Sequence, residues 1–328
     1  MSNPFNSDYP LPLMPGLKVL FKLAEYKTFD VVHCHHPFNV GYFSRLLAQQ
    51  YHAPLVFSYH TRYDIYANHY LKFLPKFMKN YLIEKSIKNF CRKTNLVITP
   101  SEFVKEKLLK SMPKLKVVTV ASGLPHIPKL DMTKDKIRKK LKIPVNKKIL
   151  LTVCRLAKEK NLNRLLQCIE NLSNKYFLLI IGGGPYEKEL KMQADKKRIQ
   201  NRILFAGIIN HENLAAYYQA ADIFVYASVS ETQGLVLLEA LSFGLPVVAV
   251  DCANTREWVT DSTGRLARNN PKDLSDKIIS LEKADMEEMA QKAKELAGMF
   301  TISKTADRIL DEYRKLKFKF LDKLTRRQ

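Results

Sequence analysis

Two glutamates eight residues apart form the most informative pattern in the sequence. Glu231 and Glu239 stand in SETQGLVLLEALSFGLP, where a glycine turn precedes an apolar helical run. Carboxylates at this spacing can lie along one edge of a cleft. The first-turn amides at Gln233, Gly234 and Leu235 would lack partners inside the helix and, with the helix dipole, would form an anion site. Ordinary charge complementation at a helix start explains the same residues, so spacing alone leaves both interpretations open.

Three further segments accompany the two glutamates over residues 149–250. They are VCRLAKEKN, which follows a strand-like run, IIGGGPYEKEL, and FAGIINHENLAAYYQAADIFVYAS. Taken singly, a glycine turn that lets a helix pack closely and two more cations in a basic protein would explain the first two. Together and in this order, the four segments resemble the retaining family 4 glycosyltransferases, which have the GT-B fold.

The resemblance implies a site residue by residue. The donor-binding residues would be Arg155, Lys160, Gly183, Gln233, Gly234, Leu235 and Glu239, and the catalytic residues would be His60 and Glu231. Arg155 and Lys160 would hold the donor diphosphate, Glu239 the ribose and Glu231 the sugar hydroxyls. The family mechanism is a front-face transfer without an enzymic nucleophile. It implies no cofactor and no metal bound by the protein, with Mg²⁺ at most a stimulating ion.

Histidines stand at two expected strand ends in the first half of the chain. His33 and His35 alternate in FDVVHCHH, and His60 closes the next strand. Alternation puts two imidazoles on one face, which could ligate zinc, although a tetrahedral site needs three or four ligands. The family resemblance instead places His60 near the transferred sugar. A strand-end histidine bonded to the backbone is the plain alternative.

Alternating strands and helices predict two Rossmann-like α/β domains that face each other across a cleft. The expected boundaries are 1–128 for the acceptor-side domain, 129–302 for the nucleotide-binding domain, and 303–328 for a helix that crosses back to the first. A linker is expected at residues 124–147. Compared with the family, the first domain is expected to be incomplete, without the N-terminal βαβα unit and its glycine-rich loop. We therefore expect the chain from Met1 to be poorly active. The family's Gly-Gly after the PVVAV strand is also replaced, by DCANTREWV.

Composition limits the class of protein. The 328 residues carry a net charge of +22 with 46% hydrophobic residues, which excludes a disordered or collagen-like chain and favours phosphate-bearing partners. No apolar run approaches 18 residues, and five scattered cysteines fit a reducing cytosol. Any membrane contact would be peripheral.

Residues 71–93 combine seven cations and one acid with apolar side chains at helical spacing. That composition is typical of a helix that lies on an anionic membrane, and equally of a core helix with a solvated basic face. The resemblance favours the membrane. The residues expected to contact it are Lys72, Phe73, Lys76, Phe77, Lys79 and Lys88.

The TQGL variant of the glutamate motif and this helix resemble bacterial glucosyl-diacylglycerol synthases. The expected function is transfer of glucose from UDP-glucose to diacylglycerol or monoglucosyl diacylglycerol, at the cytoplasmic face of the cell membrane. One alternative is a cell-envelope polysaccharide precursor as acceptor. Another is a catalytically defective remnant that binds lipid or nucleic acid, although no nucleic-acid module is recognisable. The sequence predicts no oligomeric state.

Overall fold

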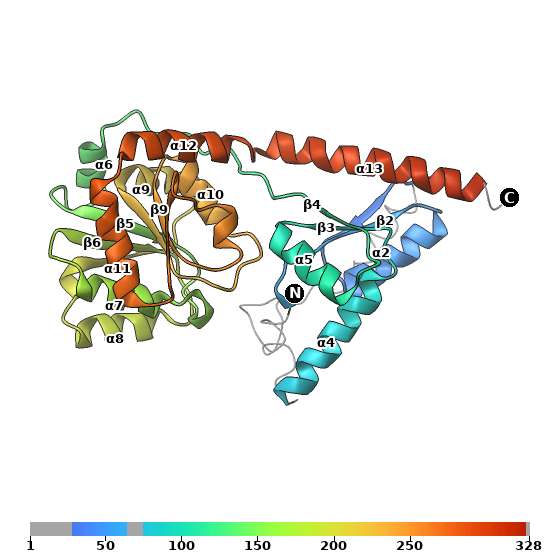
Figure 1. Ribbon diagram of the computed structural model, residues 1–328, viewed down its shortest axis with the longest axis horizontal. Helices are drawn as coiled ribbons and strands as arrows, with labels where there is room; N and C mark the ends of the chain where they lie inside the picture. The colour runs from blue at the N-terminus through green and yellow to red at the C-terminus, as the bar shows by residue number, and fades with distance from the viewer. Residues whose placement is uncertain (1–27, 64–74, 326–328) are drawn as a thin grey trace. The chain divides into compact units, whose positions relative to one another are not determined.

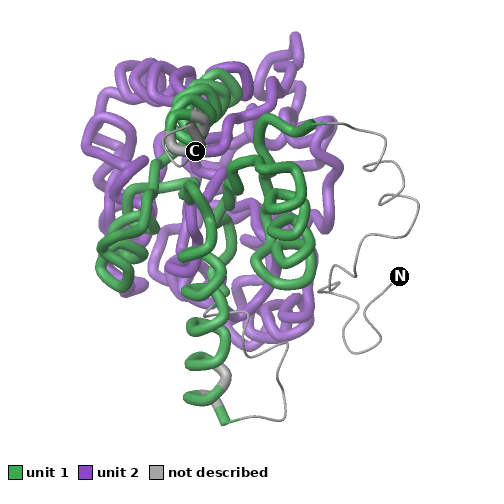
Figure 2. The backbone as a smooth tube through the Cα atoms, turned by 90° about the vertical axis from the view of Figure 1, so that its right-hand side faces the viewer, with its two compact units in different colours: residues 1–121, 305–328 green, residues 122–304 purple. Residues whose placement is uncertain are grey.

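The computed structural model describes residues 28–63 and 75–325. The chain divides into two compact units (Figure 2). Unit 1 holds residues 1–121 and 305–328, and unit 2 holds residues 122–304. The unit boundaries thus fall at residues 121 and 304, where the sequence placed them at 128 and 302.

Unit 2 contains a six-stranded parallel sheet in the order β10-β9-β8-β5-β6-β7. The strands are β5 (Lys148–Val153), β6 (Tyr176–Ile181), β7 (Ile203–Gly207), β8 (Ile223–Tyr226), β9 (Val247–Val250) and β10 (Gly264–Ala267). Runs such as YFLLII and VVAV are buried along their whole length, as expected for parallel strands that are covered on both faces. The alternating pattern in the sequence therefore predicted this unit correctly.

Helices cover both faces of the unit 2 sheet (Figure 1). One layer contains α7 (Leu162–Asn171), α8 (Glu187–Lys196) and α11 (Pro271–Ser280). The other contains α6 (Lys134–Lys140), α9 (Leu214–Ala220), α10 (Leu235–Ser242) and α12 (Met286–Gly298). The strand order reverses at β5, which pairs with β6 on one side and β8 on the other. Loops that leave the carboxyl ends of β5 and β8 diverge at such a point, and ligands bind in the crevice that results.

Residues 124–147, expected to be a linker, are an integral part of unit 2. Arg138 of α6 is only 4% exposed, and its guanidinium donates to the Asp222 carboxylate at 2.6 Å and to the Ala220 carbonyl at 2.9 Å. Asp222 also accepts from the Ile149 amide at 2.7 Å. Burial would raise the pKa of Asp222, but Lys134, the Ile149 amide and Arg138 outweigh it and hold the pKa below its ordinary value.

Asp222→Ala would leave the buried Arg138 guanidinium without its counter-charge. We expect the free energy of unfolding of unit 2 to fall by about 3–5 kcal/mol. Denaturant unfolding followed by the fluorescence of Trp258, the single tryptophan, reports on this unit. Asp276→Ala on α11 is the control and should cost less than about 0.5 kcal/mol. Equal losses from both substitutions would contradict this account of α6.

The described part of unit 1 holds four parallel strands in the order β1-β2-β3-β4. They are β1 (Val32–Cys34), β2 (Leu55–Ser58), β3 (Leu96–Thr99) and β4 (Val117–Thr119). The helices are α2 (Asn39–Gln50), α4 (Lys76–Cys91), α5 (Glu102–Ser111) and α13 (Ile302–Thr325). Phe57 and Phe90 pack edge to face at 5.2 Å in the core that joins α4 to the sheet.

The last helix of the chain belongs to unit 1, far in sequence from the rest of that unit. Leu316 of α13 is buried against Val56 and Ile98, whose side chains leave the sheet on the face opposite to the Phe57 core. Tyr313 hydrogen-bonds to His33, and Lys317 pairs with Asp30. The amphipathic pattern of α13 therefore serves as the cover of one sheet face.

Candidate functional site

The predicted donor residues gather at the carboxyl edge of the unit 2 sheet, on the loops that follow β5, β6 and β8. Arg155 and Lys160 follow β5, the glycine turn follows β6, and Glu231 lies in the loop between β8 and α10. The carboxyl ends of parallel strands share one edge, so three segments separated in sequence contribute to one region.

The glycine turn is shaped by close contact with the loop that carries Arg155. A Cβ on Gly182, where φ is +130°, would lie 1.9 Å from the Cys154 carbonyl oxygen, and one on Gly184 would lie 2.4 Å from that of Leu156. The Leu156 amide donates to the Gly183 carbonyl at 2.9 Å. Only glycine permits this approach. The turn therefore positions the half-buried Arg155, whatever ligand that residue binds.

Lys160 and Glu231, assigned to different parts of the donor, are ion-paired with each other. Lys160 ends a short 3-10 helix (Lys158–Lys160), and its amino group contacts the Glu231 carboxylate. Both side chains are largely buried, with 14% and 25% exposure. The ion pair places a cation and a carboxylate side by side at the carboxyl edge of the sheet. Either group could break the ion pair and bind a ligand group instead.

Helix α10 begins at Leu235, with Gly234 as a left-handed N-cap at φ +76°. No side chain caps this end, so the amides of Leu235 and Val236 have no partner within the helix. Of the predicted set of 233–235, only Leu235 thus lies inside the helix. Glu231 lies in the loop four residues before the helix, and only Glu239 is helical.

The side chain of Gln233 is occupied by the backbone of its own unit. It is 4% exposed, accepts from the Ser122 amide at 2.9 Å and donates to the Ser122 carbonyl at 3.1 Å. Its carbonyl accepts from the Trp258 indole at 2.9 Å. Gln233 therefore holds the loop between β8 and α10 in place through its side chain.

Two buried polar groups beneath Gly234 were missed by the sequence reasoning. Asn254 is 3% exposed, and neither its amide nitrogen nor its amide oxygen has a hydrogen-bond partner within the part of the chain that the structure describes. The hydroxyl of Tyr226, at the end of β8, is also buried without a hydrogen-bond partner among the described residues. A Cβ on Gly234 would lie 3.2 Å from the Asn254 nitrogen and 3.3 Å from the Tyr226 oxygen.

Unpaired buried polar groups cost free energy and call for an explanation. Asn254 and Tyr226 adjoin the uncapped start of α10, so a polar ligand there would find additional partners. The only sequence signal was that DCANTREWV departs from the family pattern.

Glu239 is held from the neighbouring helix. Its carboxylate accepts from the hydroxyl of Tyr218, on α9, at 2.6 Å. Tyr218 is fully buried and stacks on Phe243 at 5.1 Å. Burial and the nearby carboxylate raise the pKa of Tyr218 well above its ordinary value. The phenol therefore stays a donor, and Glu239 stays an oriented acceptor.

In unit 1, the structure brings the predicted histidines together. His35 stacks on His60 at 5.5 Å and lies 4.5 Å from His33 between ring centroids. His33 also contacts the Ser58 hydroxyl at 2.8 Å. Burial, reinforced by His35, lowers the pKa of both His33 and His60 to about 4. Within residues 28–63 and 75–325, no three His, Cys, Asp or Glu side chains are placed to hold a metal ion.

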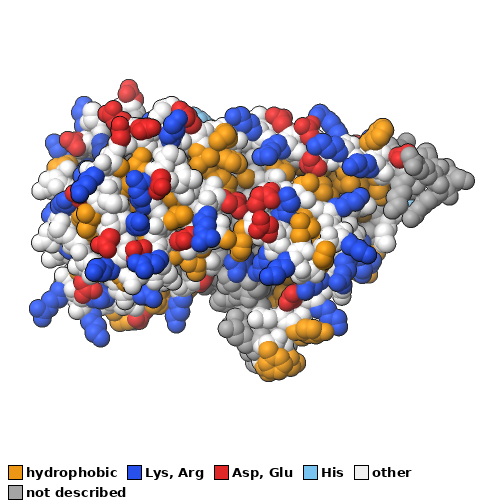
Figure 3. Space-filling view, viewed as in Figure 1, with side chains coloured by type: hydrophobic (Ala, Val, Ile, Leu, Met, Phe, Trp, Pro, Cys, Tyr) orange, Lys and Arg blue, Asp and Glu red, His pale blue; other side chains and the backbone are white. Residues whose placement is uncertain are grey.

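The predicted membrane-contacting residues lie on or just before α4. Lys72 and Phe73, and the side chains of Lys76 and Lys79, lie outside the described parts of the structure. Phe77 is 74% exposed, and the other exposed apolar residues of this helix are Met78, Tyr81 and Leu82. Their spacing defines one face, and apolar side chains gather at this end of unit 1 in Figure 3. Lys88 pairs with Glu84 at 2.5 Å.

No described helix is long and apolar enough to cross a membrane.

Known families match both parts of this chain. Residues 133–297 match the family "Glycosyl transferases group 1", and residues 2–125 match "Glycosyltransferase Family 4". The chain belongs to the group 1 glycosyltransferases. The resemblance seen in the sequence motifs is thereby confirmed.

Two curated relatives of this glycosyltransferase are alpha-monoglucosyldiacylglycerol synthases. The protein from Streptococcus pneumoniae is 31% identical over 243 residues, which are 71% of this chain and 54% of that protein. The protein from Acholeplasma laidlawii is 29% identical over 230 residues, which are 67% and 58% of the two chains. The chain spans about half the length of the curated relatives it matches.

The fold is shared with solved structures. The structure of Anabaena HepE in complex with UDP and glucose has a TM-score of 0.76 at 19% identity, covering 91% of this chain and 81% of that one. This likeness and the two parallel sheets confirm the predicted α/β architecture of GT-B type.

Acid should destabilise unit 1 before its carboxylates titrate. The folded-state pKa of His60, about 4, lies below the ordinary 6.5. Between these two pH values the unfolded chain binds a proton at His60 and the folded chain does not, so protonation favours unfolding. This stability is complete above pH 6.5 and is lost as the pH falls towards 4. Hydrogen exchange at the β2 amides should therefore accelerate between pH 6.5 and 5, after correction for the intrinsic rate. His60→Gln should flatten this dependence, whereas His211→Gln in unit 2 should not.

Two buried amides of the same loop region should respond in opposite ways to replacement by leucine. Gln233→Leu leaves the Ser122 backbone unpaired and should lower the free energy of unfolding by about 1–3 kcal/mol. Asn254→Leu removes unpaired groups and should preserve or raise stability, while weakening UDP binding at least tenfold. Calorimetry with UDP and unfolding followed by Trp258 measure both. A destabilised Asn254→Leu protein with unchanged UDP affinity would contradict the ligand role.

Proposed function

We propose that this glycosyltransferase transfers glucose from UDP-glucose to the hydroxyl of diacylglycerol or monoglucosyl diacylglycerol, with retention of configuration. The observation that carries the donor half is the uncapped start of α10 above the unpaired groups of Asn254 and Tyr226. Helix amides without partners favour a diphosphate, and the buried groups beneath them gain hydrogen bonds when it binds.

The residues around the start of α10 bind different parts of the UDP-glucose donor. Arg155 and Lys160 supply positive charge for the diphosphate, on a loop that the glycine turn keeps in place. Glu239, oriented by Tyr218, accepts from the ribose hydroxyls. When Lys160 turns to the phosphates, the Glu231 carboxylate is released to accept from the sugar hydroxyls.

The leaving diphosphate gains negative charge as the glycosidic bond breaks. The α10 amides are held in place by the helix, and Lys160, once it has turned from Glu231 to the diphosphate, adds its charge with Arg155, so these groups stabilise the transition state. In the front-face mechanism, a departing phosphate oxygen accepts the proton of the acceptor hydroxyl. His60 is neutral at physiological pH, because burial lowers its pKa to about 4, and it serves as a hydrogen-bonding group near the transferred sugar.

The acceptor half rests on α4 and on the relatives. The face formed by Phe77, Met78, Tyr81 and Leu82 is apolar and exposed, on a helix of a strongly basic protein. Such a face is stabilised by insertion among the headgroups and acyl chains of an anionic bilayer. A lipid acceptor reached from the cytoplasmic membrane surface fits this face better than a soluble polysaccharide precursor. Both cited relatives are named for glucosyl-diacylglycerol synthesis.

Two exposed phenylalanines of unit 1 offer a matched test. Phe77 on α4 is 74% exposed and Phe318 on α13 is 77% exposed. With the full-length protein, Phe77→Ser should lower glucose transfer to diacylglycerol in anionic vesicles at least fivefold, because an inserted side chain is lost. Phe318→Ser should leave it within twofold. Transfer is measured with radiolabelled UDP-glucose and extraction of the lipid product.

The same assay tests the proposed lipid acceptor separately from the proposed glycosyltransferase activity. Transfer to a polysaccharide precursor, with none to diacylglycerol, would overturn the lipid acceptor and retain the glycosyltransferase. Equal effects of the two phenylalanine substitutions would overturn the role of α4.

A further inference from the structure

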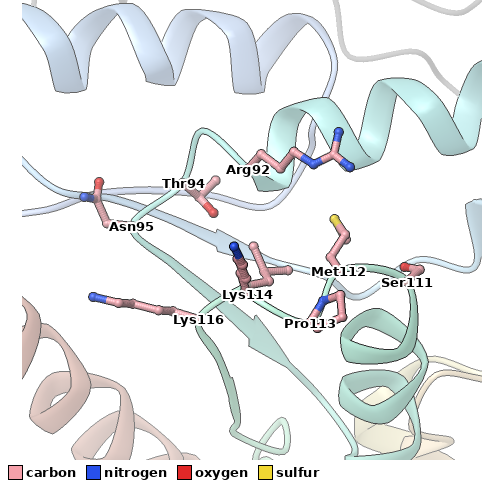
Figure 4. Close-up of a pocket in the computed structure, with 9 residues that line it drawn as sticks. Arg92, Thr94, Asn95, Ser111, Met112, Pro113, Lys114 and Lys116 are labelled. Carbon is pink, nitrogen blue, oxygen red and sulfur yellow. The ribbon is translucent and has the colours of Figure 1, made fainter.

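Unit 1 contains a cavity that the transfer reaction does not use. Its volume is about 560 Å³, and it lies where the end of α4 meets the segment between α5 and β4. Three cations line it, Arg92, Lys114 and Lys116, and no acidic residue does. Figure 4 shows the guanidinium of Arg92 on the side where Met112 and Ser111 lie, and the two lysine amino groups towards the other side.

The three charges have no counter-charge in the part of the chain that the structure describes. None of them forms an ion pair there, whereas Lys88 on α4 and Lys105 on α5 do. Arg92 caps the carboxyl end of α4, where the helix dipole favours a cation. That explanation does not extend to the lysines. Like charges around one cavity raise its positive potential and attract an anion.

The two hydroxyls of the cavity and the amide oxygen of Asn95 are already engaged within the protein. The Thr94 hydroxyl donates to the Cys91 carbonyl at 2.7 Å, and the Asn95 side chain accepts from the Leu55 amide at 2.8 Å. The Ser111 hydroxyl donates to the Leu108 carbonyl at 3.1 Å. The side-chain donors left for a ligand are the three cations and the Asn95 amide nitrogen, a set that favours a charged group such as phosphate over a sugar.

An apolar groove adjoins this cavity. The groove has a volume of about 400 Å³, runs between α4 and α5, and shares Ser111 and Met112 with the cationic cavity. Its apolar lining consists of Ile83, Ile87, Val104, Leu108 and Met112. Further lysines, Lys88, Lys107 and Lys110, lie along it with a single acid, Glu84. An occupant of both spaces must carry a negative group next to an apolar chain.

We propose that the two spaces bind one molecule of an anionic glycerophospholipid. Its phosphate lies between Arg92 and the two lysines, where a guanidinium can donate two parallel hydrogen bonds to phosphate oxygens. One acyl chain lies in the groove between α4 and α5. Charge complementarity selects the anionic lipid, and the groove selects a lipid over free phosphate. The proposal goes beyond the transfer reaction and does not depend on it.

The position of the cavity agrees with a helix that lies flat on a membrane. Phe77 stands in the first turn of α4 and Arg92 caps its carboxyl end, so the exposed apolar face and the cationic cavity lie at opposite ends of one helix. A helix of 16 residues is about 24 Å long. Contact along its length brings an inserted aromatic end and a headgroup-binding end to the same surface.

Neighbouring cations provide the decisive control. Arg92 lines the cavity, whereas the adjacent and equally exposed Lys93 does not. The probe is dihexanoyl phosphatidylglycerol below its micelle concentration, titrated calorimetrically into the full-length protein without UDP-glucose. We expect binding that Arg92→Ala weakens at least tenfold and Lys93→Ala less than twofold. Lys114→Ala should resemble Arg92→Ala.

Three titrants identify the ligand class. Dihexanoyl phosphatidylcholine and inorganic phosphate should each bind at least tenfold more weakly than the phosphatidylglycerol. Phosphate binding as tight as that of the lipid would overturn the lipid and show a free-anion site. Equal losses from Arg92→Ala and Lys93→Ala would overturn the cavity and show unspecific surface attraction. Because no sugar transfer is measured, these outcomes are independent of the proposed reaction.

Discussion

The reversal of strand order at β5 is the constraint on which the donor region depends. Because β5 pairs with β6 on one side and β8 on the other, the loops after β5 and β8 leave the same edge in different directions. Lys160 comes from the first loop and Glu231 from the second, and they meet as an ion pair. The glycine turn after β6 then fixes the first loop, since its backbone approaches Cys154 and Leu156 too closely for any side chain.

Two buried amides of this region differ in whether their hydrogen bonds are satisfied. Gln233 and Asn254 are both buried amides, but Gln233 uses both of its amide atoms on the backbone of Ser122. Asn254 uses neither within the described residues. A buried amide that stays unpaired is costly in the free protein, so its presence beside an uncapped helix start points to a ligand. Residue type alone would have assigned the two amides to the same role.

Unit 1 keeps its histidines and its cationic cavity in separate places. Its histidines His33, His35 and His60 stack in a partly exposed cluster, and partial burial lowers the pKa values of His33 and His60. The cations at the end of α4 are exposed around a cavity with no acid in its lining. The histidine cluster lies next to the carboxyl ends of β1 and β2, whereas the cationic cavity lies at the far end of α4. The histidine cluster and the cationic cavity are therefore two separate polar surfaces of unit 1.

The sequence by itself determined the fold class, and it predicted a set of residues that the structure gathers at the carboxyl edge of the unit 2 sheet. Buried apolar runs of strand length alternate with amphipathic helices, and glycine, glutamate and basic residues occupy fixed positions between them, so local pattern carries this information. Tertiary structure decided which residues are partners. The pairing of Lys160 with Glu231 joins positions 71 residues apart, and the bond from Tyr218 orients Glu239 across two helices.

The role of Asn254, the docking of α6 through Arg138 and the cationic cavity at Arg92 also required the tertiary structure. Each depends on whether a polar group finds a partner after the chain has folded. That outcome is set by contacts between distant segments, and a residue's type and its immediate neighbours do not encode it.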